Sequence, residues 1–229
     1  MKIKKIVILS ILIFIFTATG FSVSNKKKII VNYMMYRGIF LKVDNLNNAL
    51  IDKGYPEINS YCDSVGIGNH NIIQKKIIFG INYHQFYGNN SRNGNYSTKL
   101  TGNWELFSFG FILYNTKNIY FYPIFNFGYG ELNINIIESS IDSFSKVLDQ
   151  NSLMDGVVMK TSSYLFEPTI GIDFYMENNI FGTLFFGIRS GYMMSPLNYG
   201  WTVNGISISG GPATRIEGFF ISFSAGMLL

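Results

Sequence analysis

The feature that most constrains this chain is a stretch in which the side chains alternate with a period of two. Between Ile119 and Tyr129 every odd-numbered position is apolar or aromatic, whereas the even-numbered positions include Asn126 and Gly128. A period of two places the two sets of side chains on opposite faces of a β-strand. The stretch therefore predicts a long strand with one wholly apolar face.

The same alternation recurs along the chain, in residues 77–85, 163–176, 180–194 and 219–229. Short Asn-rich connections are expected at 68–71, 115–118 and 177–179, because Asn tolerates the left-handed conformations of tight turns. Longer polar connections lie between them at 44–59, 88–96, 139–156 and 196–214. Together these patterns predict eight strands, at 30–43, 60–68, 72–88, 97–115, 119–138, 157–177, 180–196 and 213–229.

One stretch departs from the pattern. Residues 100–114 alternate less regularly than the other predicted strands. A β-bulge inserts one extra residue and shifts the faces of the strand that follows it. We therefore expect a bulge near residues 105–107.

The N-terminus has the features of a secretory signal peptide. Lys2, Lys4 and Lys5 precede an apolar run at residues 6–16, and small residues follow at 17–20, 22 and 24. This order is typical of an export signal, and the run is short for a membrane-spanning helix. We expect residues 1–24 to be the signal, cleaved between Ala18 and Asn25, and residues 25–229 to be the mature domain. An uncleaved N-terminal anchor is the alternative.

The composition excludes several classes of protein. Charged residues make up 14% of the chain, against about 25% in a typical soluble domain. Three of the 18 basic residues lie in the signal, which holds no acid, so 15 basic against 14 acidic residues leave a mature net charge near +1. That balance gives no reason to expect a nucleic-acid partner. Cys62 is the one cysteine, so no internal disulfide is possible. No apolar run after residue 24 is long enough for a spanning helix.

An exported chain rich in apolar-faced strands favours a β-barrel in the outer membrane. In lipid every backbone N–H and C=O needs a partner within the protein, and only helices or closed barrels supply it. The strand from Tyr120 to Tyr129 is about 30 Å long at roughly 3.3 Å per residue. Tilted by about 40°, it spans roughly 23 Å, close to the ~25 Å apolar band of such barrels. A soluble sandwich or lipocalin-like barrel is the alternative.

Aromatic residues are expected to form two belts at the membrane interfaces, where Tyr and Trp are enriched. Near the short turns the predicted belt comprises Tyr114, Tyr120, Phe121, Tyr175 and Phe181. Near the long loops it comprises Phe86, Tyr129, Tyr164 and Tyr192.

From about residue 29 to the end, the chain resembles the small, eight-stranded, porin-like outer-membrane β-barrel proteins of bacteria. The resemblance rests on the signal peptide, on the segments IYFYPIFNFGYG and YLFEPTIGIDFY, and on the last strand GFFISFSAGMLL. It implies an all-β, eight-stranded antiparallel transmembrane barrel with short periplasmic turns and longer extracellular loops. It also implies the lipid bilayer and the outer-membrane assembly machinery as partners. Members of this family usually end in an aromatic residue that the machinery reads, whereas this chain ends in Leu229.

The face opposite the apolar one carries polar residues that are expected to point into the barrel. An eight-stranded barrel is just wide enough for side chains to fill it. The interior is predicted to be filled, with Arg189 paired with Glu167 or Asp173, because a buried charge needs a partner. A polar lumen that binds a small solute or passes ions is the alternative. The predicted inward residues are Asn82, His84, Asn126, Glu167, Asp173 and Arg189, together with Arg37 and Glu105.

The sequence gives little support for an enzyme. A lipid-modifying outer-membrane enzyme would need a Ser and His pair facing outward or at the rim. His70 is expected in a tight turn and His84 inside the barrel, so neither fits that role. Two distant His and one Cys also lack the spacing of a metal site. No cofactor, metal or catalytic residue is therefore predicted.

The long connections are the expected functional surface, because binding residues concentrate on loops. Residues 44–54 are predicted to form a short helix, with Asp44 as its cap, Leu46 and Leu50 on one face, and Gly54 as its stop. Residues 141–148 also show helical spacing. The two helices either pack together over the barrel mouth as a cap or lie independently on the rim. Trp201 and Pro212 are expected to anchor the last loop.

The sequence thus predicts an exported, non-enzymatic, integral outer-membrane barrel. Structural, surface-binding and small-solute roles all remain open for it. A lipid-modifying enzyme and a soluble periplasmic ligand-binding barrel are the alternatives from other classes.

Overall fold

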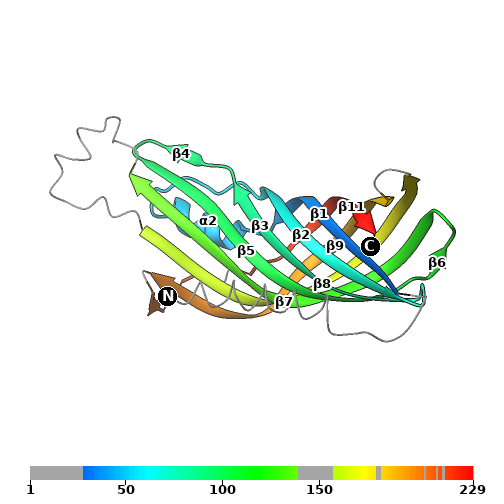
Figure 1. Cartoon of the computed structure of the whole chain (residues 1–229). Coiled ribbons are helices and arrows are strands. Elements are labelled where there is room, and N and C mark those ends of the chain that lie inside the picture. The colour runs from blue at the N-terminus through cyan, green and yellow to red at the C-terminus, as the bar shows by residue number, and fades with distance from the viewer. Residues whose placement is uncertain are drawn as a thin grey trace.

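A computed structural model describes residues 28–138, 157–178, 182–203, 205–209, 211–212 and 215–228 of the chain. The predicted signal (1–24), the 141–148 helix and the turn end at 179 lie outside these residues. Eight long strands form the body of the molecule (Figure 1). They are β1 (Lys28–Leu41), β2 (Tyr61–Ile73), β3 (Ile77–Gly88), β5 (Tyr96–Phe111), β7 (Ile119–Glu138), β8 (Val157–Asn178), β9 (Gly182–Val203) and β11 (Gly218–Leu228). Among the described residues, no helix has the length and apolarity needed to cross a membrane.

The strands close into a barrel. Each of the eight pairs antiparallel with its neighbours in the chain, β5 pairs with β7, and β1 pairs with both β2 and β11. The first and last strands are therefore joined and the sheet has no open seam between them. The predicted eight-stranded antiparallel barrel is confirmed.

The register sets the tilt of the strands. A path of directly paired residues leaves β1 at Ile29, crosses all eight strands and returns to β1 at Ile39, ten residues further along (39 − 29 = 10). One circuit thus climbs about 33 Å along a strand while crossing about 38 Å of sheet, which corresponds to a tilt of about 40°. The strands therefore have the tilt of about 40° at which the sequence predicts a membrane-spanning wall.

Four short elements lie at the two ends of the barrel. The helix α2 (Asp44–Ile51) and the short strands β4 (Ser91–Asn93) and β10 (Ile206–Ile208) lie at one end, here called the long-loop end (Figure 1). The short strand β6 (Tyr114–Asn115) lies at the other end, here called the short-turn end.

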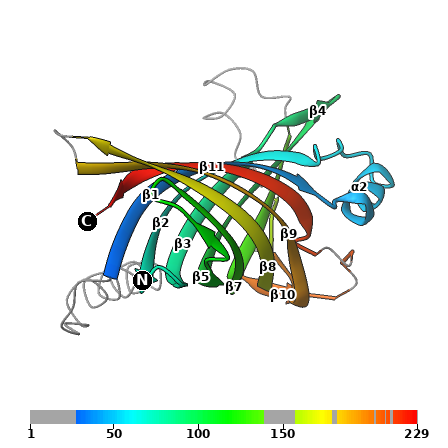
Figure 2. The ribbon, with the colours of Figure 1, turned by 90° about the vertical axis from the view of Figure 1, so that its right-hand side faces the viewer.

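The barrel is uneven in height. β8 and β9 each contain 22 residues, whereas β1 has 14 and β11 has 11. β9 pairs with β11 only as far as Met193 and then continues to Val203 beside β8 and β10. One side of the wall therefore extends further than the other at the long-loop end. Figure 2, a view from the short-turn end, shows β10 beside the far part of β9.

The predicted second strand was too short, and the predicted turn at 68–71 was wrong. β2 runs on to Ile73, and the turn is formed by residues 74–76, with positive φ at Gln74 (53°) and Lys75 (55°). Two successive positive φ values mark the type I′ turn that matches the twist of a hairpin. The Asn residues around His70 suggested a turn, but they lie within the strand and their side chains bond to one another on its outer face.

The bulge predicted near residues 105–107 was also wrong. β5 keeps one register with β3 and with β7 along its whole paired length. The alternation is obscured because large apolar residues, Trp104 and Leu106, occupy the inner face, whereas Glu105 points outward. Glu105 was expected inside. The register shifts that do occur lie between β8 and β9, at Thr161/Ser163 and Tyr164/Phe166.

The ends of several strands differ from the predicted ones. β5 ends at Phe111 rather than 115, β9 continues to Val203 rather than 196, and β11 begins at Gly218 rather than 213. Polar residues such as Asn198 and Thr202 resemble a loop in the sequence, but in β9 they belong to the part of the wall that rises above its neighbours.

The two aromatic belts are only partly as predicted. Tyr114, Tyr129 and Tyr164 are exposed on the outside. Phe86, Tyr120 and Tyr175 instead point inward and are buried. The alternation of side chains assigns each of these three residues to the inner face. Nearness to a turn, on which the belt prediction relied, does not determine which face a side chain occupies. Phe181 lies outside the described residues.

Candidate functional site

Apolar side chains fill the barrel interior near the long-loop end. Trp104, Phe86, Phe220 and Met193 from the wall pack there with almost no exposure. The segment after β1 completes this upper core, with Leu46 of α2 among its buried members. The interior is therefore closed by packed side chains at this level.

A second apolar cluster closes the interior near the short-turn end. It includes Val31, Ile72, Ile78, Ile124 and Phe185, all of them buried. Interiors packed to this degree leave few voids larger than a water molecule.

Polar and charged side chains lie in the layer between the two clusters. The guanidinium of Arg37 on β1 donates to both oxygens of Glu167 on β8, at 2.7 and 3.2 Å. Glu167 also accepts a hydrogen bond of 2.9 Å from Nδ2 of Asn126. The Arg37 guanidinium lies over the Phe220 ring, 3.9 Å from its centroid. Both charges are thus paired, as a buried ion pair requires.

A directed chain of hydrogen bonds continues from this ion pair. Ser108 donates to Asn126 (2.6 Å), and Asn82 donates to Ser108 (2.6 Å). The Tyr33 hydroxyl donates to Asn82 (2.5 Å) and lies 2.7 Å from Nε2 of His70. The chain therefore connects side chains of five strands across the interior.

Arg189 belongs to a neighbouring cluster. Its Nε donates to the Tyr122 hydroxyl (3.0 Å), which in turn donates to Asp173 (2.8 Å). A guanidinium nitrogen of Arg189 lies 3.9 Å from Asp173, and the guanidinium carbon lies 4.4 Å from the centroid of the Tyr33 ring. Arg189 is therefore beside Asp173, whereas Glu167 is held by Arg37.

His84 is placed apart from both clusters. It stacks on Trp104 with 5.5 Å between ring centroids, and its Nδ1 lies 3.4 Å from the Ser64 hydroxyl. This Ser and His pair is what a hydrolytic enzyme would use, but both side chains are fully buried inside the barrel, and no carboxylate of the described residues bonds to His84. A lipid substrate has no access to it.

All six predicted inward residues (Asn82, His84, Asn126, Glu167, Asp173 and Arg189) lie buried in the interior. Hydrogen bonds link Asn82, Asn126 and Glu167 in one cluster, and Arg189 and Asp173 belong to the other. His84 is bonded to Ser64 and belongs to neither cluster. Sequence reasoning missed the partners that hold them together: Tyr33, His70, Ser108 and Tyr122. Tyr33, Ser108 and Tyr122 sit at positions that strict alternation assigns to the inner face, and that signal would have found them. His70 was missed because the turn was misplaced.

The helix α2 caps the interior. Leu46 and Leu50 are buried in the upper core, and Asn47 exchanges two hydrogen bonds with the backbone of Ile58 (2.8 and 2.9 Å). Gly54 ends this segment with a φ of 77°. Asp44 is the first helical residue rather than the predicted cap; Val43 occupies the cap position without a side-chain bond.

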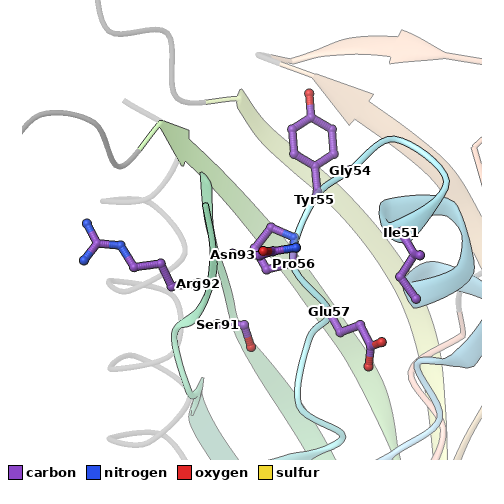
Figure 3. A pocket seen from close by; sticks show the side chains of 8 residues that line it. All are labelled: Ile51, Gly54, Tyr55, Pro56, Glu57, Ser91, Arg92 and Asn93. Atoms are coloured by element: carbon purple, nitrogen blue, oxygen red, sulfur yellow. The ribbon is translucent and has the colours of Figure 1, made fainter. Parts of the chain in front are cut away.

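The outer rim of the cap carries two adjoining hollows of about 380 and 410 Å³. They lie between the α2 segment and β4 and share Glu57 and Ser91. Figure 3 shows β4 alongside residues 54–57, with the Arg92 side chain directed away from them. The lining of both hollows is mainly polar and includes Asn47, Asn59 and Asn93.

The last long connection is anchored to the wall. Nε1 of Trp201 on β9 donates to the carbonyl of Pro212 at 2.8 Å, and Ile216 is buried in the upper core. This is the role predicted for Trp201 and Pro212. Across the described residues, no three His, Cys, Asp or Glu side chains gather in a way that could hold a metal ion.

The outer face of β8 is apolar between the two ends. On β8 every outward residue from Phe166 to Met176 is apolar, and Ile170 is 57% exposed. Ten residues at a tilt of about 40° span about 25 Å, the height of the apolar band of outer-membrane barrels. Beyond Tyr164 the next two outward residues of β8, Ser162 and Lys160, are polar, and Val158 follows them.

Comparison with known proteins supports the fold. No protein-family model matches the sequence, and no curated protein matches it significantly. Two solved structures of Ail, the attachment invasion locus protein of Yersinia pestis, are similar in three dimensions. One is 11% identical with a TM-score of 0.48, covering 90% of this chain and all of Ail. The other, in complex with the heparin analogue sucrose octasulfate, is 10% identical with a TM-score of 0.52, covering 89% of this chain and all of Ail. At this identity the second likeness shows the fold alone, and the chain therefore has the closed, eight-stranded antiparallel β-barrel fold that is also seen in Ail.

Proposed function

We propose that the chain is an exported, non-enzymatic protein of the bacterial outer membrane that binds an extracellular partner through its long-loop end. Residues 1–24 act as the export signal in this proposal, and residues 25–229 form the mature barrel. The observation that carries it is the contrast between an interior blocked at two levels and a long-loop end that is built up above the barrel wall.

Membrane insertion is supported by the outward side chains. Large apolar residues such as Met34 (71% exposed) and Phe223 (55%) cover the wall. Exposed apolar surface of this extent marks a membrane or protein contact, since soluble monomers rarely display it. Closure of the barrel leaves no strand edge to be satisfied by water.

A transport role is disfavoured by the packing of the interior. A diffusing solute would have to pass the cluster around Trp104 and the cluster around Phe185, which lie on either side of the Arg37–Glu167 layer. Eight-stranded barrels are filled by their own side chains, whereas aqueous channels need many more strands.

Binding at the cell surface is supported by the long-loop end. There α2, the hollows beside Glu57 and the raised wall of β7, β8 and β9 present polar side chains outside the apolar band. Loops on a rigid scaffold are where binding residues concentrate. The similar protein Ail is an attachment invasion locus protein, and one of its structures holds a heparin analogue.

Extraction tests the membrane placement. The mature chain is expected to stay in the membrane fraction in carbonate and high salt, to require detergent for release, and to change gel mobility when heated. Release by salt or carbonate would instead favour a soluble periplasmic barrel. Single cysteines introduced at Lys53 and Lys117, which lie at opposite ends, should be labelled on intact cells only at position 53.

Conductance and binding assays test the role. The refolded barrel is expected to leave a planar bilayer at background conductance. Cells that display it are expected to bind heparin-coated beads more than bare beads, and shortening residues 44–58 should weaken that binding. Steady single-channel currents, or binding equal to that of cells without the protein, would overturn the proposal.

A catalytic assay addresses the enzyme alternative. Because His84 and Ser64 are sealed inside the barrel, His84→Ala is expected to leave lipid A and phospholipid composition unchanged in cells. Lipid turnover that depends on the full chain and is lost in His84→Ala would show that the protein is an enzyme.

A further inference from the structure

Three asparagines on β1 and β2 form a hydrogen-bonded ladder on the outside of the barrel. Nδ2 of Asn71 donates to Oδ1 of Asn69 at 2.8 Å, and Nδ2 of Asn69 donates to Oδ1 of Asn32 at 2.7 Å. All three side chains are half-buried and belong to the outward set of their strands. We call Asn32, Asn69 and Asn71 the asparagine ladder.

The asparagine ladder lies within the apolar band rather than at its edge. Asn69 is paired with Ile81 of β3 on one side, and Asn32 is paired with Met227 of β11 on the other. Ile81 is in turn paired with Phe107, which is 42% exposed. The carboxamides are therefore flanked by lipid-facing side chains in both directions around the wall.

The amide nitrogen at one end of the ladder and the carbonyl oxygen at the other end are both without a partner among the described residues. Among the described residues, no group accepts from Nδ2 of Asn32 and none donates to Oδ1 of Asn71. Acyl chains offer no hydrogen bonds, and a polar group removed from water without a partner is costly. The ladder is thus incomplete at its two ends.

The two free ends lie at nearly the same depth. Along the membrane normal, a path of paired residues rises about 25 Å in one circuit of eight strands, which is about 3 Å for each step from one strand to the next. Moving one residue along a tilted strand changes the height by about 2.5 Å. Asn69, directly paired with Asn32, is therefore about 3 Å above it, and Asn71 lies two residues, or about 5 Å, below Asn69. Asn71 and Asn32 then differ in depth by only about 2 Å.

We propose that this face binds a second copy of the chain, with the donor end of each asparagine ladder meeting the acceptor end of the other. A twofold axis along the membrane normal places Asn32 of one copy opposite the second copy's Asn71, and the reverse contact follows by symmetry. Such an interface uses the same patch on both copies, and equal depth is the condition for it in a membrane. The inference relies on the membrane placement proposed above but not on the binding role.

Energy transfer between barrels in vesicles tests the proposal. The mature chain would carry a cysteine at Lys117, which is exposed, while Cys62 is buried and unreactive. Donor- and acceptor-labelled chains are mixed in phosphatidylcholine vesicles at decreasing protein-to-lipid ratios. Transfer above the random-proximity level is expected for the parent chain. It should be lost in Asn32→Leu/Asn71→Leu, which removes both free ends and suits a lipid-facing position.

The matched control lies on the opposite side of the barrel. Ile172→Leu on β8 is expected to leave the energy transfer unchanged. Transfer at the random level for the parent chain, or transfer that survives the double substitution, would overturn the dimer. Heat-modifiable gel mobility of each variant reports folding separately. A parent chain whose gel mobility does not change on heating would argue against the membrane barrel itself. A parent chain whose mobility does change on heating, but which shows no energy transfer, would refute only the dimer.

Discussion

Arg37 on β1 and Glu167 on β8 join opposite parts of the barrel wall through two hydrogen bonds of 2.7 and 3.2 Å. The side chains are 3% and 0% exposed, so neither charge is hydrated. The pair lies between two apolar clusters, and Asn126 satisfies Glu167 further. It therefore ties strands that are distant in the chain into one interior layer.

Removing one member of this pair should strongly destabilise the barrel. Arg37→Met leaves the Glu167 carboxylate buried without its cation, and such losses cost about 3–5 kcal/mol. Unfolding in urea can be followed by gel mobility and by the fluorescence of Trp104 and Trp201. Glu177→Gln, which breaks the exposed pair with Lys117, should change stability by less than about 1 kcal/mol. A similar small effect for Arg37→Met would mean that the ion pair is not structural.

Removing both charges should be better tolerated than removing one. Arg37→Met/Glu167→Met replaces the pair by apolar side chains of similar length, and such replacements are often neutral. The double variant is therefore expected to be more stable than Arg37→Met alone in the same urea titration. Additive losses would contradict a direct coupling between the two residues.

The Tyr33 hydroxyl connects two parts of the interior hydrogen-bond chain. Tyr33→Phe would leave the Asn82 carbonyl and the His70 ring without it, and we expect a loss of about 1–3 kcal/mol. The control is Tyr114→Phe at an exposed position (59%) of β6, which should have no measurable effect. Equal stability of the two variants in urea would show that the chain contributes nothing to folding.

The cap should stabilise the barrel without acting as a gate. Leu50→Ala removes a buried side chain of α2, and a loss of about 2–5 kcal/mol is typical of such positions. The neighbouring Ile51→Ala, at an exposed position, is the control. Because the cluster around Phe185 still blocks the interior, Leu50→Ala should remain at background conductance in a planar bilayer. Channel openings in this variant would identify α2 as a gate.

The bond from Trp201 to Pro212 should hold the last long connection against the wall. Trp201→Phe removes the 2.8 Å hydrogen bond, worth about 0.5–1.5 kcal/mol, and should mainly loosen the loop. Trypsin is then expected to cut at the exposed Arg215 several times faster, and the urea midpoint should also fall because Trp201 is buried in the upper core. Tyr199→Phe on the outer face should leave the cleavage rate unchanged, and no difference between the two variants would argue against the anchor.

Alternation along the chain was enough to predict the barrel and most of its inner face. The long runs around Phe125 and Ile170 show a period of two so clearly that strand, orientation and inward residues follow from them directly. The predicted turn at 68–71 and the predicted bulge near 105–107 were wrong because the local composition there obscures the alternation. The Asn residues around His70 have the composition of a turn, and the large apolar side chains on both faces of β5 hide its regularity.

The architecture can thus be read from the amino-acid pattern alone: an even number of apolar-faced strands and the polar residues they enclose. Side-chain periodicity is local, so each strand shows it independently. Which of those polar residues meet depends on the closed sheet. Arg37 and Glu167 are 130 positions apart, and their contact depends on the ten-residue offset gained in closing the barrel. The same offset also sets the partners of His70, the position of the cap over the interior and the depth of the asparagine ladder. Register is a property of the closed sheet and not of any single segment.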